Sequence, residues 1–175
     1  AFFMSAANDN LFVVYGAWFE RTFQLSVLEL GFGTAVIGAA ELAGEILTAS
    51  VSDRLGLKKA VAAGAALSTA CYLLLPFCEG SLFFAFSGLF LIFLFYEFTI
   101  VSSLSLCTEL LPKSRATMMS GFFAAAGLGR VLGALMGGPL WISLGIWGVV
   151  IISGVSGALA LVFFLYGMRG WKTVP

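Results

Sequence analysis

Six long runs of apolar residues, separated by short charged or turn-forming segments, make up most of the chain. None of them alternates apolar and polar residues at every second position, as the strands of a membrane β-barrel do. Each approaches the roughly 20 residues that an α-helix needs to cross the hydrocarbon core of a bilayer. The pattern predicts an all-α integral membrane protein, a single bundle of six transmembrane helices within residues 1–175. The expected spans are residues 2–18, 30–50, 60–77, 82–107, 118–141 and 146–168.

The segments between the runs contain residues typical of helix ends. Glu20-Arg21 follows the first run, and Ser143-Leu144-Gly145 predicts a tight corner between the last two. The first run has no basic segment before it, and Asn8-Asp9-Asn10 interrupts it, so it is not interpreted as a cleaved signal peptide. Because the chain begins with Ala rather than Met, we expect it to be a piece of a longer protein or a processed one.

The composition narrows the class of protein further. Hydrophobic residues make up 61% and charged residues only 10% of the chain, against about 45–50% and about 25% in soluble domains. Nine basic residues balance nine acidic ones, so no basic surface suggests a nucleic-acid partner. His is absent and the three Cys form no CxxC pair. We therefore expect neither an enzyme nor a bound metal or other cofactor.

The positions of Lys and Arg predict the orientation, because short cytoplasmic loops of membrane proteins are enriched in these residues. If the amino end is cytoplasmic, Arg21 lies on the opposite side and Arg130 lies within the fifth span. The remaining basic residues then fall in cytoplasmic loops and the tail: Arg54, Lys58, Lys59, Lys113, Arg115, Arg169 and Lys172. We expect both ends of this segment to be cytoplasmic, in the cell (inner) membrane.

Five ionisable residues interrupt the apolar runs, at a cost of about 2.5–3.5 kcal/mol each at the bilayer centre. They are Asp9, Glu41, Glu45, Glu97 and Arg130. They fall on the first, second, fourth and fifth spans, while the third and sixth contain none. This distribution predicts four helices around a polar interior and two that face lipid. The five are candidates for substrate binding and proton coupling, and the alternative is a set of purely structural pairs.

Depth along the helices suggests partners for Arg130, whose guanidinium keeps its charge in proteins. With a rise of about 1.5 Å per residue, Glu41 lies about 18 Å and Glu97 and Arg130 about 22 Å from the cytoplasmic edge. We therefore expect Arg130 to pair with Glu97 or Glu41 in at least one state. In the fifth span, Gly127, Gly133, Gly137 and Gly138 are candidates for close helix packing, since small residues let helices approach in lipid.

Three short segments resemble signatures of the major facilitator superfamily. Asp53-Arg54-Leu55-Gly56-Leu57-Lys58-Lys59 is similar to its loop pattern G-x-x-x-D-R-x-G-R-[KR], with Ala49 in place of the first Gly and Leu57 in place of an Arg. Residues 109–115, with Glu109, Pro112 and Arg115, resemble its E-x-x-P-x-x-R pattern. The glycines of the fifth span resemble its antiporter-type motif, with Ala134 where Pro would stand.

The resemblance implies one six-helix half of a transporter that has two. The degenerate loop motif and the lack of an Arg near the start of the fourth span favour the carboxy-terminal half. It also implies that the first, second, fourth and fifth helices line a central cavity. The loop would act as a cytoplasmic gate, with Arg54 and Lys58 pairing with carboxylates in one conformation. The gating-loop candidates are Asp53, Arg54, Gly56, Lys58 and Lys59.

These observations predict a secondary active transporter that exports a small molecule by alternating access, coupled to protons. Buried carboxyl groups suit such coupling because desolvation favours their neutral form. The expected partners are the lipid bilayer, a second six-helix half or a second copy, a small-molecule substrate and protons. The alternative is a transport-inactive relative that serves as a scaffold or assembly subunit of a membrane complex.

Overall fold

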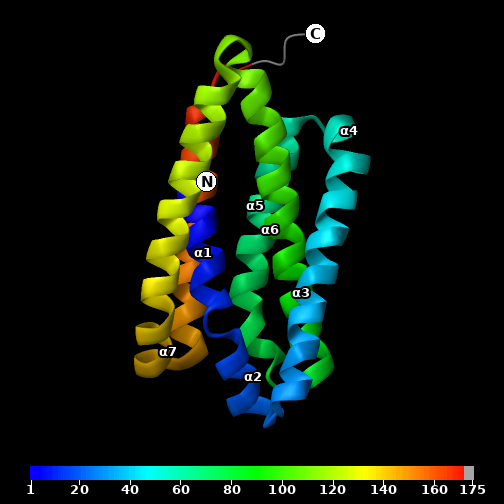
Figure 1. Ribbon diagram of the computed structural model, residues 1–175, viewed down its shortest axis with the longest axis vertical. Coiled ribbons are helices and arrows are strands. Elements are labelled where there is room, and N and C mark those ends of the chain that lie inside the picture. The colour runs from blue at the N-terminus through cyan, green and yellow to red at the C-terminus, as the bar shows by residue number, and fades with distance from the viewer. Residues whose placement is uncertain (172–175) are drawn as a thin grey trace.

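A computed structural model describes residues 1–171, and within them the chain is helical with no strand, which confirms the all-α prediction. Lys172 of the basic tail lies outside the described residues. The α-helices are α1 (Phe2–Phe12), α2 (Tyr15–Phe23), α3 (Val27–Leu47), α4 (Asp53–Leu55), α5 (Leu57–Leu74), α6 (Leu82–Leu110) and α7 (Arg115–Gly167). The short helices between them are η1 (Thr48–Ser52), η2 (Leu75–Cys78) and η3 (Pro112–Ser114). The long helices run along one axis of an elongated bundle (Figure 1).

Four helical segments of the described chain are long and apolar enough to cross a membrane. They are Val27–Leu55, Leu57–Cys78, Leu82–Leu110 and Pro112–Gly167. The last has 56 residues and would measure about 84 Å if it were straight, far more than the roughly 30 Å of a hydrocarbon core. The molecule is therefore built as an integral membrane protein whose last segment cannot be one straight span.

The long helix α7 is a helical hairpin. Gly145 has φ 67° and ψ −157°, a backbone conformation open to glycine but strained for other residues. The chain reverses there, at the corner expected from Ser143-Leu144-Gly145, and the two arms run side by side (Figure 1). We call residues 115–144 the first arm of α7 and residues 146–167 its second arm.

The first apolar run folds as two short helices rather than one continuous helix. α1 ends at Phe12, and α2 begins at Tyr15 after the β-branched pair Val13-Val14, residues of low helix propensity. The Val14 N–H donates to the Leu11 carbonyl, a tighter turn than that of an α-helix. α2 then continues beyond Glu20-Arg21 to Phe23, where Gln24 takes a left-handed conformation with φ 55°.

The second run extends beyond its expected bounds of 30–50 at both ends. It begins at Val27 because Ser26 and Glu29 form a reciprocal capping box, in which the Ser26 N–H donates to Glu29 Oε2 over 2.8 Å. At the other end, α3 passes through the π-helix η1 into α4. This continuous helical stretch stops at Gly56, whose φ is 83°.

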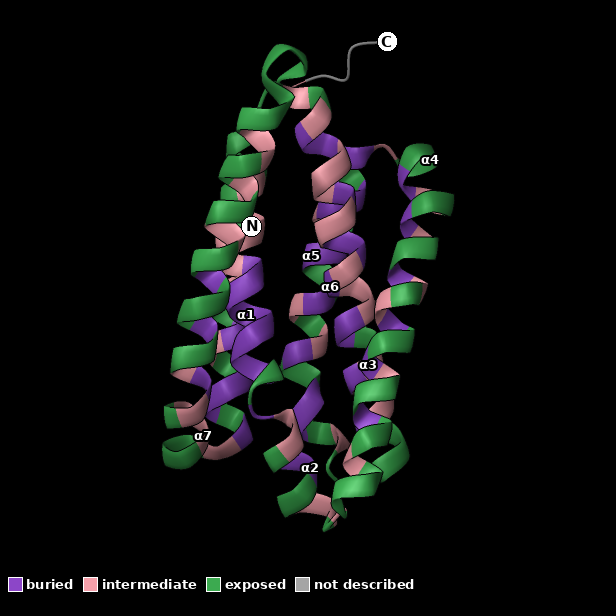
Figure 2. Ribbon diagram, in the orientation of Figure 1, coloured by how far each residue is buried: buried purple, intermediate pink, exposed green. Residues whose placement is uncertain are grey.

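α1 forms the core of the bundle, and every residue from Met4 to Leu11 is buried (Figure 2). The first arm of α7 packs against one side of it, where Gly129, Gly133 and Gly137 lie directly over the α1 backbone. The second arm packs through hydrogen bonds. Asn10 donates from Nδ2 to the Val149 carbonyl over 2.8 Å and to Ser153 Oγ over 2.9 Å. α1 is thus fixed between both arms.

Candidate functional site

A cavity of about 310 Å³ opens between α1, α3, α6 and the first arm of α7. Its lining residues are Asn8, Asp9, Phe12, Glu41, Phe93, Tyr96, Glu97, Ile100, Leu104, Phe123 and Arg130. Four of the five ionisable residues singled out in the sequence therefore line one cavity. The fifth, Glu45, is exposed one turn further along α3 and is not part of the lining.

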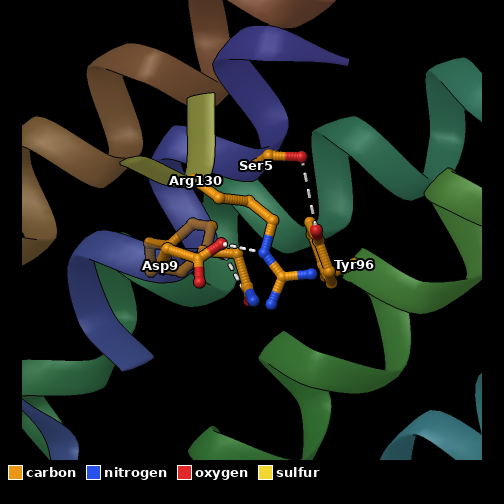
Figure 3. A network of polar contacts seen from close by, with 6 residues as sticks. Ser5, Asp9, Tyr96 and Arg130 are labelled. Carbon is orange, nitrogen blue, oxygen red and sulfur yellow. Dashed lines mark hydrogen bonds and ion pairs between the residues drawn. The ribbon is translucent and has the colours of Figure 1, made fainter. Parts of the chain in front are cut away.

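The cavity contains an ion pair between helices far apart in the chain. Arg130 Nε lies 3.2 Å from Asp9 Oδ2, and Figure 3 shows the guanidinium directed from α7 between Asp9 and Tyr96. The two partners differ in solvent access, since the Arg130 side chain is 65% exposed and that of Asp9 only 9%. Arg130 thus places a fixed positive charge at the mouth of the cavity and Asp9 a negative charge in its wall.

The partner of Arg130 in this structure differs from the expected one. Depth along the helices pointed to Glu97 or Glu41, whereas the pair forms with Asp9. The reason is the neighbouring Gly129, which lies on the α1 backbone at Phe2 and brings the first arm of α7 close to α1. Within residues 1–171 no ion pair involves Glu41 or Glu97, although both line the same cavity as Arg130. Pairing with them in another transport state stays a prediction.

The polar residues of α1 have partners that the sequence analysis did not name. Tyr72 of α5 donates from its hydroxyl to Asn8 Oδ1 over 3.3 Å, and Ser153 of α7 donates to the Ala7 carbonyl over 2.8 Å. The hydroxyl oxygens of Ser5 and Tyr96 lie 3.5 Å apart beside Arg130 (Figure 3). The interruption of the first apolar run by Asn8-Asp9-Asn10 was the available signal, because buried polar side chains require partners.

Aromatic side chains form the apolar part of the cavity wall. Phe12 and Phe93 pack edge to face, with ring centroids 6.0 Å apart. Phe93 and Tyr96 are buried one turn apart on α6, while Phe12 and Phe123 are exposed at the rim. The cavity therefore combines carboxylates, one guanidinium and aromatic faces. Among the described residues, no group of three His, Cys, Asp or Glu could hold a metal ion.

The candidate gating loop lies at the opposite end of α3 from its capping box. Gly56 makes the turn between α4 and α5, and Asp53 and Arg54 are exposed on α4 without an ion pair in the described chain. Lys58 donates from Nζ to the backbone carbonyl of Met168 over 2.6 Å. In this structure Lys58 therefore contacts the carboxyl end of α7 instead of a carboxylate.

The candidate packing glycines divide into two pairs. Gly133 and Gly137 lie against the α1 backbone, so a side chain at either position would meet Ala6 or Asn10. Gly127 and Gly138 have open space where a Cβ would stand, so within the described chain they do not serve helix packing. Gly129 contacts α1 instead, because the buried stripe follows the four-residue spacing 129, 133, 137.

These features define a helical membrane protein with a charged, aromatic-lined cavity among its helices. The family model of the Major Facilitator Superfamily matches residues 1–174, so the chain belongs to this superfamily of transporters. An uncharacterized MFS-type transporter of Bacillus subtilis (strain 168), YceJ, is 28% identical over 173 residues. The match covers 99% of this chain and 43% of that relative, so the chain spans less than half of its length. No solved structure matches the chain.

Proposed function

We propose that the chain is one six-helix half of a secondary active transporter that exports a small molecule in exchange for protons. The observation that carries the proposal is the cavity, which collects Asp9, Glu41, Glu97 and Arg130 from four different helices. Ionisable groups inside membrane-spanning helices are costly, and they mark substrate or ion pathways. Alternating access then exposes this cavity to each side of the membrane in turn.

In this proposal the six spans correspond to helices of the structure. The pair α1–α2 is the first span, the stretch from α3 to α4 the second, α5 the third and α6 the fourth. The two arms of α7 are the fifth and sixth, since α7 reverses at Gly145. A second half completes the transporter, in the same protein or as a second copy. The chain's coverage of 43% of the Bacillus relative leaves room in that protein for such a half.

The same proposal includes the orientation and the choice of half. The seven Lys and Arg residues expected on one side favour cytoplasmic ends in the cell (inner) membrane. The degenerate loop motif favours the carboxy-terminal half. In this orientation Lys58 lies at the cytoplasmic end of α5, where it contacts the end of α7.

Reconstitution of the full-length protein in liposomes tests the proposal. Candidate compounds are screened for proton-driven transport and, separately, for counterflow exchange, which needs no proton gradient. We expect Glu41→Gln and Glu97→Gln to lose proton-driven transport and retain exchange at saturating substrate, because Gln keeps the shape of Glu but cannot ionise. Arg130→Ala should lose coupled transport as well. Wild-type proton-driven transport in all three variants would contradict the assigned roles.

The scaffold alternative makes the opposite prediction. A transport-inactive subunit would show no flux for any compound in the wild-type protein, yet would co-purify with the remaining subunits of its complex. The charged cavity favours transport, because a structural pair alone would account for Asp9 and Arg130 but not for Glu41 and Glu97.

A further inference from the structure

We propose that the substrate bound in the cavity is a monovalent organic cation with an apolar body. This inference rests on the proposed function only in placing the cavity on the transport path; binding itself is independent of it. The cavity volume of about 310 Å³ lies at the small end of the roughly 300–1,000 Å³ of small-molecule sites.

The charge of the lining is the first argument. Three carboxyl groups, those of Asp9, Glu41 and Glu97, face one guanidinium. The pair between Asp9 and Arg130 cancels one of these charges, and the structure gives Glu41 and Glu97 no cationic partner within residues 1–171. A monovalent cation placed beside Glu41 and Glu97 supplies one of the two missing counter-charges, whereas an anion there would be repelled by both.

The second argument is that Asp9 is already occupied by Arg130. Its side chain lines the cavity although it is only 9% exposed. Its Oδ2 atom is buried and accepts no hydrogen bond from the described residues, so the ion pair with Arg130 is its only polar interaction there. This oxygen is closed to solvent, so a ligand in the cavity does not reach it, and Glu41 and Glu97 are the carboxylates left for a cation.

The aromatic wall distinguishes an organic cation from a metal ion. Phe12, Phe93, Tyr96 and Phe123 contribute four rings to the same cavity. Cations with an apolar shell bind to the faces of such rings. Hard metal cations instead require several oxygen ligands in close array, and no such group of side chains exists in the described chain.

The role of Arg130 follows from the same geometry. Its guanidinium is held by Asp9 at the rim, so its charge is partly cancelled before a cation enters. Glu41 on α3 and Glu97 on α6 then contact the cationic centre, and Phe12 and Phe93 enclose its apolar body. Protonation of Glu41 or Glu97 would weaken cation binding, which gives a direct route to exchange of a cation for protons.

Binding of radiolabelled phenyltrimethylammonium to the full-length protein in nanodiscs tests the inference. Its neutral isostere, tert-butylbenzene, has the same shape without the charge and serves as competitor. We expect saturable binding of the cation and little competition by the isostere. Glu41→Gln and Glu97→Gln should each weaken binding about tenfold or more. Glu20→Gln, which removes an exposed carboxylate on α2 outside the cavity, should leave binding unchanged.

A second variant separates ligand contact from folding. Phe12→Leu keeps an apolar side chain at the rim but removes the ring, so it should weaken binding of the cation, with thermal stability unchanged. Absence of saturable cation binding by folded protein, or equal binding of cation and isostere, overturns the inference. Cation binding without any flux would contradict the transport proposal alone, and flux of another compound without cation binding would contradict the substrate class alone.

Discussion

Lys58, at the start of α5, donates a hydrogen bond from Nζ to the carbonyl oxygen of Met168, one residue beyond the end of α7. The two residues are 110 positions apart in the chain. The bond places a positive charge at the carboxyl end of a helix, where the helix dipole favours it. The same carbonyl, which lacks a partner within the helix, also accepts from the Trp171 N–H over 3.3 Å. A loop residue expected to act as part of a gate thus also holds two helix ends together.

Replacing Lys58 by Met should therefore destabilise this end of the bundle. A charge-assisted hydrogen bond and its dipole interaction are together worth about 1–2 kcal/mol at a half-buried position. Lys59→Met is the matched control, because the Lys59 side chain is exposed next to it. Thermal unfolding of the purified full-length protein measures the difference. Equal melting temperatures of the two variants would show that the bond to Met168 contributes nothing.

Within the ion pair of the cavity, loss of Arg130 should destabilise the protein more than loss of Asp9. Arg130→Gln leaves the buried Asp9 carboxylate without a cation, at an expected cost of about 2–3 kcal/mol. Asp9→Asn leaves a guanidinium that is 65% exposed and can be hydrated, so it should cost less. The double variant should recover most of the stability lost in Arg130→Gln. A double-mutant cycle of unfolding free energies checks this, and strictly additive effects would contradict a direct pair.

The glycines of the first α7 arm should differ according to the face on which they lie. At Gly133 a Cβ would stand 2.9 Å from the backbone nitrogen of Asn10, so Gly133→Ala forces the arm away from α1 and should cost about 1–3 kcal/mol. At Gly127 there is open space, so Gly127→Ala should be neutral or stabilising by up to about 1 kcal/mol. Melting temperatures of both variants test this prediction. A larger loss of stability in Gly127→Ala than in Gly133→Ala would show that the packing face is assigned wrongly.

The orientation can be tested with two proteins that each carry a single thiol. In the proposed topology Cys78, half-buried at the turn between α5 and α6, lies near the extracytoplasmic surface, so one protein retains this cysteine alone. Cys107 is buried and is a poor probe of the other side. The second protein therefore carries Lys113→Cys, at an exposed loop position, in a background without the native cysteines. A membrane-impermeant maleimide added to intact cells should label the first protein and spare the second. The reverse labelling pattern would invert the topology.

The sequence predicts the features that depend only on position along the chain, such as where a helix lies and how deep a residue lies in the membrane. Apolar runs place the helices, and Gly145 marks the reversal of α7 because a tight corner favours glycine. The cost of charge in lipid identifies Asp9, Glu41, Glu97 and Arg130, and the structure brings these four to one cavity. Glu45 shows the limit of the argument, since an equally costly residue one turn away lies outside the lining.

The sequence could not predict which side chains of different helices meet. That depends on how each helix is rotated about its axis and on which helix lies beside it. Depth alone gave Glu97 or Glu41 as the partner of Arg130, because it contains no information on which helix lies beside α7. The bond from Lys58 ends on a backbone carbonyl, which has no signature in the sequence. In contrast, the Ser26-x-x-Glu29 capping box is visible in the sequence and could have placed the start of α3 at residue 27 instead of 30.

The position of α1 between the two arms of α7 constrains the biosynthesis of the protein. Asn10 donates to acceptors on Val149 and Ser153, which leave the ribosome 139 and 143 residues later. Until then the Asn10 amide lacks both of these acceptors, so we expect α1 to stay in the translocon or at the membrane surface, or to be held by a chaperone. Truncation within the second arm should therefore expose α1 to quality-control proteases, even though α1 itself is intact.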